Sequence, residues 1–116
     1  MTGDERDELI AAVEAERQRA ATQVATLRRS VDAIVEAAEL TSTDDEHDPE
    51  GATIAYERAQ ALALLRQARD DLVRLDAVRA ALEAGATVVC ETCGTPIPVE
   101  RLLALPTART CIGCAP

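Results

Sequence analysis

Two long stretches of the chain carry apolar residues in a seven-residue rhythm. The first stretch runs from about Asp4 to Leu40 and contains no Pro or Gly. Its apolar residues occupy two alternating heptad positions and form a stripe that only Arg17 interrupts: Ile10, Val13, Ala20, Val24, Leu27, Val31, Ile34 and Ala38. Acidic residues fill the first turns, where the helix dipole favours negative charge. The pattern predicts one long helix with a narrow apolar seam that packs against a partner helix.

The second stretch, from Pro49 to about Glu83, has the same rhythm. Its seam, with two arginines at seam positions, comprises Ile54, Arg58, Ala61, Leu65, Ala68, Leu72, Leu75, Arg79 and Leu82. Pro49 suits the first position of a helix, and Gly85 is placed to end it. Because the linker between the two stretches is short, we expect the helices to pack as an antiparallel coiled-coil hairpin within one chain.

The four cysteines form the pattern C-x2-C-x17-C-x2-C, as the pairs Cys90 with Cys93 and Cys111 with Cys114. This spacing is typical of a tetrahedral zinc site. Four thiolates leave no ligand position for water, so we expect one structural Zn2+ ion. Two disulfides or a redox-active C-x-x-C pair are the alternatives. Disulfides require an oxidising compartment, and the N-terminus lacks the pattern of a signal peptide, so we expect a cytoplasmic protein.

The residues around the cysteines predict a small module. Residues 86–89 are expected to be extended, and between the cysteine pairs Pro98 can begin, and Pro106 must end, a helix of about two turns. Three leucines of this segment are expected to pack over the cysteine turns that bind the metal and over the base of the hairpin: Leu102, Leu103 and Leu105. The predicted fold is therefore all-α, with a hairpin at residues 1–85 and a C4 zinc finger at residues 86–116.

Composition narrows the classes of function. The chain has one aromatic residue, Tyr56, and a formal net charge of −9. The lack of aromatics argues against stacking platforms for single-stranded nucleic acid, and the acidic charge argues against direct, sequence-specific nucleic-acid binding. The apolar runs are too short to span a membrane. We find no nucleophile with a base, no open metal site and no phosphate-binding glycine loop, and therefore predict that the protein is not an enzyme.

The linker between the predicted helices, residues 41–51, is strongly acidic. Its five acids are Asp44, Asp45, Glu46, Asp48 and Glu50. One interpretation is a solvated loop whose polar side chains cap the helices. The other is a functional tip, because clustered carboxylates repel one another and can coordinate or perturb a hard cation such as Mg2+. His47 has no second His or Cys nearby and is interpreted as a loop residue.

The cysteine-containing segment resembles the TraR/DksA C4-type zinc-finger proteins. The resemblance rests on Cys90 to Gly94, Ile97-Pro98, Arg101-Leu102, Ala104, Pro106 and Cys111 to Cys114. It implies a coiled coil that enters the secondary channel of RNA polymerase, with the acidic tip near the catalytic Mg2+. It also implies regulation of transcription initiation, often together with ppGpp at the polymerase interface. We also expect the protein to be a monomer.

Two features depart from the family pattern. The tip motif D-x-x-D-x-A is met by Asp45 and Asp48, but its sixth position is Glu50 in place of Ala. The sequence also ends two residues after Cys114, where longer members add a C-terminal helix that helps grip the polymerase. Arg101 is expected either to brace the thiolates or to contact a partner.

The sequence therefore predicts a non-catalytic regulator of transcription initiation. A structural coiled-coil adaptor with a zinc clasp is one alternative, and it would bind a helical protein other than the polymerase. A Gre-like stimulator of transcript cleavage is another, in which the acidic tip recruits a second Mg2+ to the polymerase active site.

Overall fold

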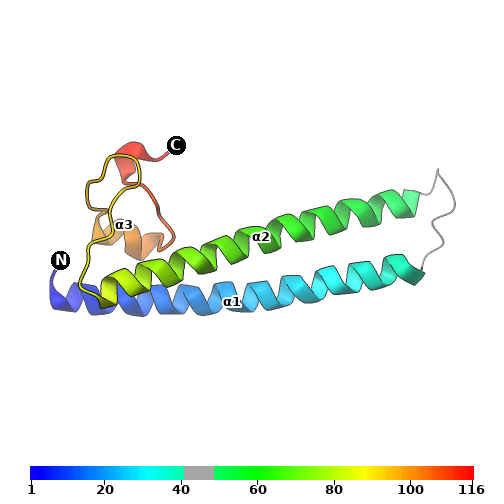
Figure 1. Ribbon diagram of the computed structural model, residues 1–116, viewed down its shortest axis with the longest axis horizontal. Helices are drawn as coiled ribbons and strands as arrows, with labels where there is room; N and C mark the ends of the chain where they lie inside the picture. Colours follow the sequence, from blue (N-terminus) through cyan, green and yellow to red (C-terminus); the bar gives the residue numbers. More distant parts are fainter. Residues whose placement is uncertain (41–48) are drawn as a thin grey trace. The chain divides into compact units, whose positions relative to one another are not determined.

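The computed structural model describes residues 1–40 and 49–116. Its long helices are α1 (Gly3–Leu40) and α2 (Pro49–Glu83), and they are followed by α3 (Val99–Ala104) and the short 3-10 helix η1 (Ile112–Cys114) (Figure 1). The described residues contain no β-strand beyond an isolated antiparallel bridge between Val89 and Pro96. The predicted all-α class is confirmed, and both long helices lie within one residue of their predicted bounds.

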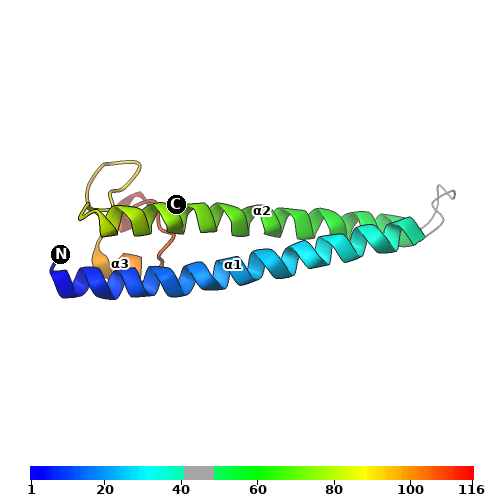
Figure 2. The same ribbon diagram turned by 60° about the horizontal axis from the view of Figure 1, so that its bottom comes forward.

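The chain divides into two compact units, which are described separately. The first unit consists of Met1–Ala20 and Asp71–Pro116, and the second is Ala21–Asp70. Within each unit, a segment of α1 lies beside an antiparallel segment of α2, as the two views in Figures 1 and 2 show. The hairpin of long helices is thus confirmed, while the division at residue 85 stays a prediction.

The heptad seam is observed in the second unit. On α1, the only residues of this unit that are not exposed are the predicted ones: Val24, Leu27, Val31, Ile34 and Ala38. On α2, the buried residues are Ala61, Leu65 and Ala68. The half-buried state of the α1 residues follows from geometry, because a seam between two helices has solvent on both sides.

The core of the first unit is wider than the predicted seam. Leu9 is fully buried, whereas the predicted seam residue Ile10 is only partly buried, and Val78 beside the seam position of Arg79 is also buried. The heptad pattern did not predict that Leu9 and Val78 are buried, so the predicted seam is corrected at these two positions. The reason is that C-terminal residues form a third surface of the same cluster, including Val88, Ile97, Leu102 and Ala108.

The arginines at seam positions in the first unit form ion pairs between the helices. Arg17 Nε donates to Asp76 Oδ1 at 2.5 Å, and Arg79 Nη1 pairs with Glu14. The hydrogen bond that Arg17 donates to Asp76 raises the pKa of Arg17. Both arginine side chains remain 37% exposed, so each pair contributes modestly, about 0.2–1 kcal/mol for exposed pairs in general. The arginines are tolerated at the seam because their charged ends reach water.

The start of α1 is fixed by a reciprocal pair of hydrogen bonds. Glu5 N–H donates to Thr2 Oγ1 at 3.1 Å, and Thr2 N–H donates to Glu5 Oε1 at 3.0 Å. This arrangement is a capping box, which satisfies backbone donors that the first helical turn leaves free. The same bonds lower the pKa of Glu5.

The end of α2 is fixed by Gly85, as predicted. Gly85 has a φ of +79°, its N–H donates to Leu82 O, and the N–H of Ala86 donates to Ala81 O. This is the Schellman arrangement, in which the left-handed residue is most often glycine because it has no Cβ.

We expect Gly85→Ala to lower the free energy of unfolding by about 1 kcal/mol, since alanine is strained in the left-handed region. Urea denaturation followed by circular dichroism measures this change. Gly3→Ala is the matched control, because Gly3 has no positive φ and open space around its Cβ position. Equal stability of the two variants would contradict the role assigned to Gly85.

No helix in residues 1–40 or 49–116 has the length and apolar character needed to cross a membrane.

Candidate metal centre

The first cysteine pair lies on a tight turn between two extended segments. Ile97 N–H donates to Val88 O at 2.9 Å, and Cys90 N–H donates to Thr95 O at 2.8 Å. Gly94 has a φ of +76° and donates its N–H to Cys90 O at 2.9 Å. The extended segment predicted after Gly85 is therefore observed, and the turn directs both sulfurs of this pair to one side.

The second cysteine pair lies on one turn of 3-10 helix. Cys111 is the N-cap residue of η1, and Cys114 N–H donates to Cys111 O at 3.2 Å. The two cysteine segments are joined by the hydrogen bond from Glu91 N–H to Arg109 O at 2.9 Å, and by the ion pair of the same two residues at 3.0 Å. The backbone hydrogen bond brings the second pair of sulfurs to the first, and the exposed ion pair adds little.

The four sulfurs have the spacing of one tetrahedral zinc site. Their ligand atoms all lie within 4.8 Å of one another, and Cys93 Sγ lies 3.7 Å from Cys111 Sγ. A tetrahedral Zn2+ with bonds of about 2.3 Å places its sulfurs about 3.8 Å apart. All four cysteines are free, and a disulfide would need sulfurs about 2.05 Å apart. The chemistry and spacing of these donors fit one Zn2+ ion.

The electrostatics of the cluster also favour a cation. Hydrogen bonds from the backbone N–H groups of Cys93 and Cys111 lower the pKa of Cys90 to about 6. Hydrogen bonds among the neighbouring thiols raise the pKa of Cys114 to about 12, because crowded sulfurs resist a further negative charge. The site therefore favours the thiolate form of Cys90 and disfavours the thiolate form of Cys114. A bound divalent cation offsets the repulsion among the sulfurs, since a metal-bound thiol is deprotonated.

Apolar side chains support the first cysteine turn from one side. Cys90 is 2% exposed and belongs to the same cluster as Ile97 and the fully buried Leu102 of α3. Of the three leucines predicted to cover this region, Leu102 is buried and Leu103 is partly buried in the cluster, but Leu105 is 47% exposed. The prediction for Leu105 is wrong because α3 ends at Ala104, and the chain then leaves the helical path.

Three arginines bind backbone carbonyls in the first unit. Arg101 Nε donates to Thr110 O at 2.7 Å, immediately before Cys111, and Arg74 Nη2 donates to Ala108 O at 2.7 Å. Arg6 Nη1 donates to the carbonyls of Leu82 and Ala86. Carbonyls of irregular segments lack the partners that a helix or sheet supplies, and the guanidinium groups replace those partners. Burial lowers the pKa of Arg74.

The sequence did not predict that Arg6 and Arg74 donate to backbone carbonyls. Heptad spacing shows which residues share a helix face, but it does not show which distant carbonyls lie nearby.

We expect Arg101→Ala to weaken zinc affinity about tenfold, since residues that orient ligands typically contribute in this range. Competition with a chromophoric zinc chelator measures the change. Arg109→Ala is a suitable comparison, because the ion pair of Arg109 with Glu91 is about half exposed and contributes little. If Arg101→Ala bound zinc as tightly as the unaltered chain, the bond to Thr110 would not position the second cysteine turn.

The predicted acidic tip lies largely outside the described residues. This applies to Asp44, Asp45, Glu46 and Asp48, and also to His47. Glu50 belongs to the first turn of α2.

Residues 85–116 match the family described as the prokaryotic dksA/traR C4-type zinc finger. All four cysteines lie within the matched segment. The predicted resemblance is therefore confirmed for the segment that carries the four cysteines, and the dksA/traR finger includes the whole of the metal centre.

Two further comparisons extend beyond the dksA/traR finger. "Uncharacterized protein YteA" from Bacillus subtilis (strain 168) is 42% identical over 69 residues, which are 60% of this chain and 29% of that protein. The chain thus matches less than a third of the length of this relative. The structure of transcription factor DksA2 from Pseudomonas aeruginosa covers 97% of this chain with a TM-score of 0.74 and 22% identity, and the match covers 81% of that chain. The chain shares the fold of this factor.

Proposed function

We propose that this chain is a zinc-binding, non-catalytic regulator of transcription initiation that binds RNA polymerase through the secondary channel. The observation that carries the proposal is the combination of a dksA/traR zinc finger at residues 85–116 with the fold of the DksA2 transcription factor. Neither feature alone specifies the partner, since a zinc finger or a helical hairpin serves many functions.

In this proposal, Cys90, Cys93, Cys111 and Cys114 hold one structural Zn2+ ion. Their sulfur spacing supports the assignment, and four thiolates leave no position for a reacting water. The zinc finger, residues 86–116, fixes the base of the hairpin formed by residues 1–85. Arg101 braces the second cysteine turn through Thr110, and its contact with a partner stays a prediction.

The hairpin presents an acidic tip to the polymerase. Asp45 and Asp48 act together with the other acids of the linker, Asp44, Glu46 and Glu50, near the catalytic Mg2+ of the polymerase. Negative charge close to a metal-centred active site changes the local field and therefore the stability of initiation complexes. The protein acts in the cytoplasm as a monomer, and ppGpp binds at the interface with the polymerase.

The proposal is tested by co-purification. The tagged full chain is expected to retain core RNA polymerase from a lysate of its own host, and to bind the purified enzyme directly. Removal of one matched heptad from each long helix should abolish the effect on initiation, because the tip would then fall short of the active site. Retention of a helical protein without polymerase would instead favour the adaptor, and stimulation of cleavage in backtracked complexes would favour a Gre-like role.

A further inference from the structure

The arginines of the two units differ in their partners. All seven arginines of the first unit donate hydrogen bonds to a carboxylate or a carbonyl: Arg6, Arg17, Arg19, Arg74, Arg79, Arg101 and Arg109. In the second unit, the side chains of Arg28, Arg58, Arg66 and Arg69 make no hydrogen bond or ion pair with any described residue. The chain has 21 acids and 12 arginines, so unpaired arginines do not reflect a shortage of carboxylates.

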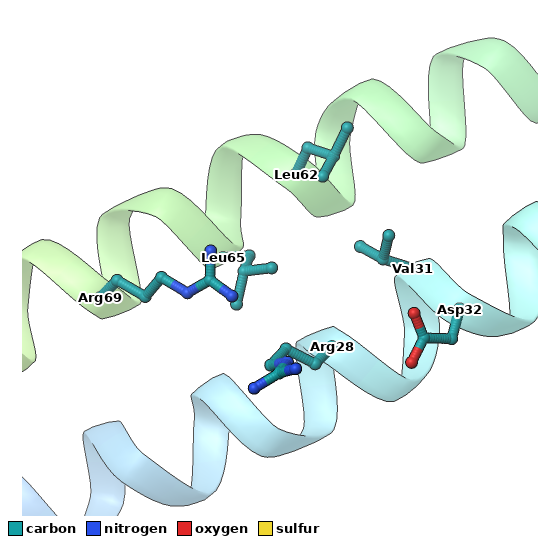
Figure 3. Close-up of a pocket in the computed structure, with 6 residues that line it drawn as sticks. All are labelled: Arg28, Val31, Asp32, Leu62, Leu65 and Arg69. Atoms are coloured by element: carbon teal, nitrogen blue, oxygen red, sulfur yellow. The ribbon is translucent and has the colours of Figure 1, made fainter.

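Two of these unpaired arginines line a pocket within the second unit. The pocket has a volume of about 280 Å³, and its walls are Arg28, Val31, Asp32, Leu62, Leu65 and Arg69. Figure 3 shows the Arg69 side chain of α2 ending beside Leu65, and the Arg28 side chain on the facing helix α1. Val31 and Leu62 lie on opposite helices at the other end of the pocket. The pocket therefore combines two cationic groups with an apolar floor.

The charges in the pocket favour an acidic ligand. Asp32 is the only acid among the lining residues, and it forms no ion pair with Arg28 or Arg69, so the pocket keeps a local positive charge in an acidic chain. Guanidinium groups bind carboxylates through two parallel hydrogen bonds, and this bond is strengthened beside apolar surface, where water is partly excluded. A partner that carries a carboxylate next to an apolar side chain would match both features.

The openness of the pocket favours a protein segment over a small molecule. Sites for drug-sized ligands usually bury most of the ligand, whereas this pocket is open and its two arginines are exposed. A protein segment needs space for only one or two side chains at each pocket, because the rest of its contact area lies outside.

We infer that this pocket, the Arg28–Arg69 pocket, is a docking site for an acidic segment of the protein partner that inserts an apolar side chain against Leu62, Leu65 and Val31. The inference rests on the proposed function, because the protein partner in that proposal is RNA polymerase. The Arg28–Arg69 pocket would be a second contact with the polymerase, separate from the acidic tip. The acidic charge of the chain repels an acidic partner elsewhere, so the pocket also selects the face at which the two proteins meet.

The test measures the affinity of the full chain for immobilised core RNA polymerase by biolayer interferometry. The variant Arg28→Glu with Arg69→Glu is expected to weaken binding at least about tenfold, because both carboxylate contacts become repulsive. The matched control is Arg58→Glu with Arg66→Glu, which makes the same change in net charge with unpaired arginines outside the pocket. This control is expected to weaken binding less than about threefold. Added salt should reduce the affinity of the unaltered chain for the polymerase more steeply than the affinity of the Arg28→Glu with Arg69→Glu variant.

The apolar floor is tested in the same assay. Leu62→Ser should weaken binding, while Leu64→Ser, a half-exposed leucine outside the pocket, should not. Thermal melts of all variants identify any loss of folding, and Arg28→Ala with Arg69→Ala must also weaken binding if the carboxylate contacts exist.

Several outcomes would overturn the inference. If the unaltered chain binds polymerase and both glutamate pairs weaken it equally, the Arg28–Arg69 pocket is not the docking site, although the proposed function stands. If the unaltered chain does not bind polymerase, the proposed function fails and the inference fails with it. If calorimetry showed that pyrophosphate binds the unaltered chain but not the variant Arg28→Glu with Arg69→Glu, the pocket would be a site for a small anion and not a docking site for a protein segment. A dimer that dissociates only in the pocket variant would show an interface between copies of this chain.

Discussion

Replacing Cys90 with serine is expected to remove zinc from the protein and to unfold the zinc finger while the long helices persist. Cys90 is the most buried of the four cysteines, and backbone N–H groups lower the pKa of its thiol. Serine would leave three thiolates and place a hydroxyl in an apolar cluster. Because zinc binding contributes about 10–16 kcal/mol in small structural zinc fingers, we expect a loss of several kcal/mol here.

Metal analysis and far-UV circular dichroism measure the two parts of this result. The helical signal should largely survive, because the seam of the second unit includes no residue of the zinc finger. Thr92→Ser is a suitable control, since Thr92 is exposed between the first two cysteines. Zinc loss without any change in stability would contradict a structural role for the metal.

Changing both Asp45 and Asp48 to asparagine is expected to abolish the effect of the protein on transcription initiation. Asparagine has nearly the shape of aspartate but no charge, so the substitution tests the electrostatic action of the tip directly. Binding to the polymerase should remain largely intact, because the hairpin and the zinc finger are unchanged. Initiation assays with purified polymerase, together with a direct binding measurement, separate the two effects.

The matched control for the tip is Asp70→Asn with Asp71→Asn. This variant removes the same charge from α2 at a distance in sequence from residues 41–51 and should retain the effect on initiation. Full activity of the Asp45 and Asp48 double variant would refute the tip mechanism. Loss of activity in both double variants would show that total charge matters, and not charge at the tip.

Features that depend on neighbours in the sequence were predictable. The heptad rhythm predicted both long helices and the seam from Val24 to Ala38, because residues spaced by three and four share one face of a helix. The turn at Gly85 and the two cysteine turns also follow from local chemistry. The cysteine spacing predicted a zinc site, since two residues between cysteines allow one tight turn to direct both sulfurs to a single ion.

The tertiary structure decided how distant segments share one core. The burial of Leu9 and Val78 requires the apolar side chains of the C-terminal segment, which no heptad count includes. The bonds of Arg6, Arg74 and Arg101 to carbonyls join residues far apart in the chain or on irregular segments. The sequence thus determined the helices, their seam and the metal ligands, because these depend on short-range periodicity and spacing. Only the folded chain decided which arginines find partners and which, like Arg28 and Arg69, are left facing a pocket, because that depends on long-range contacts.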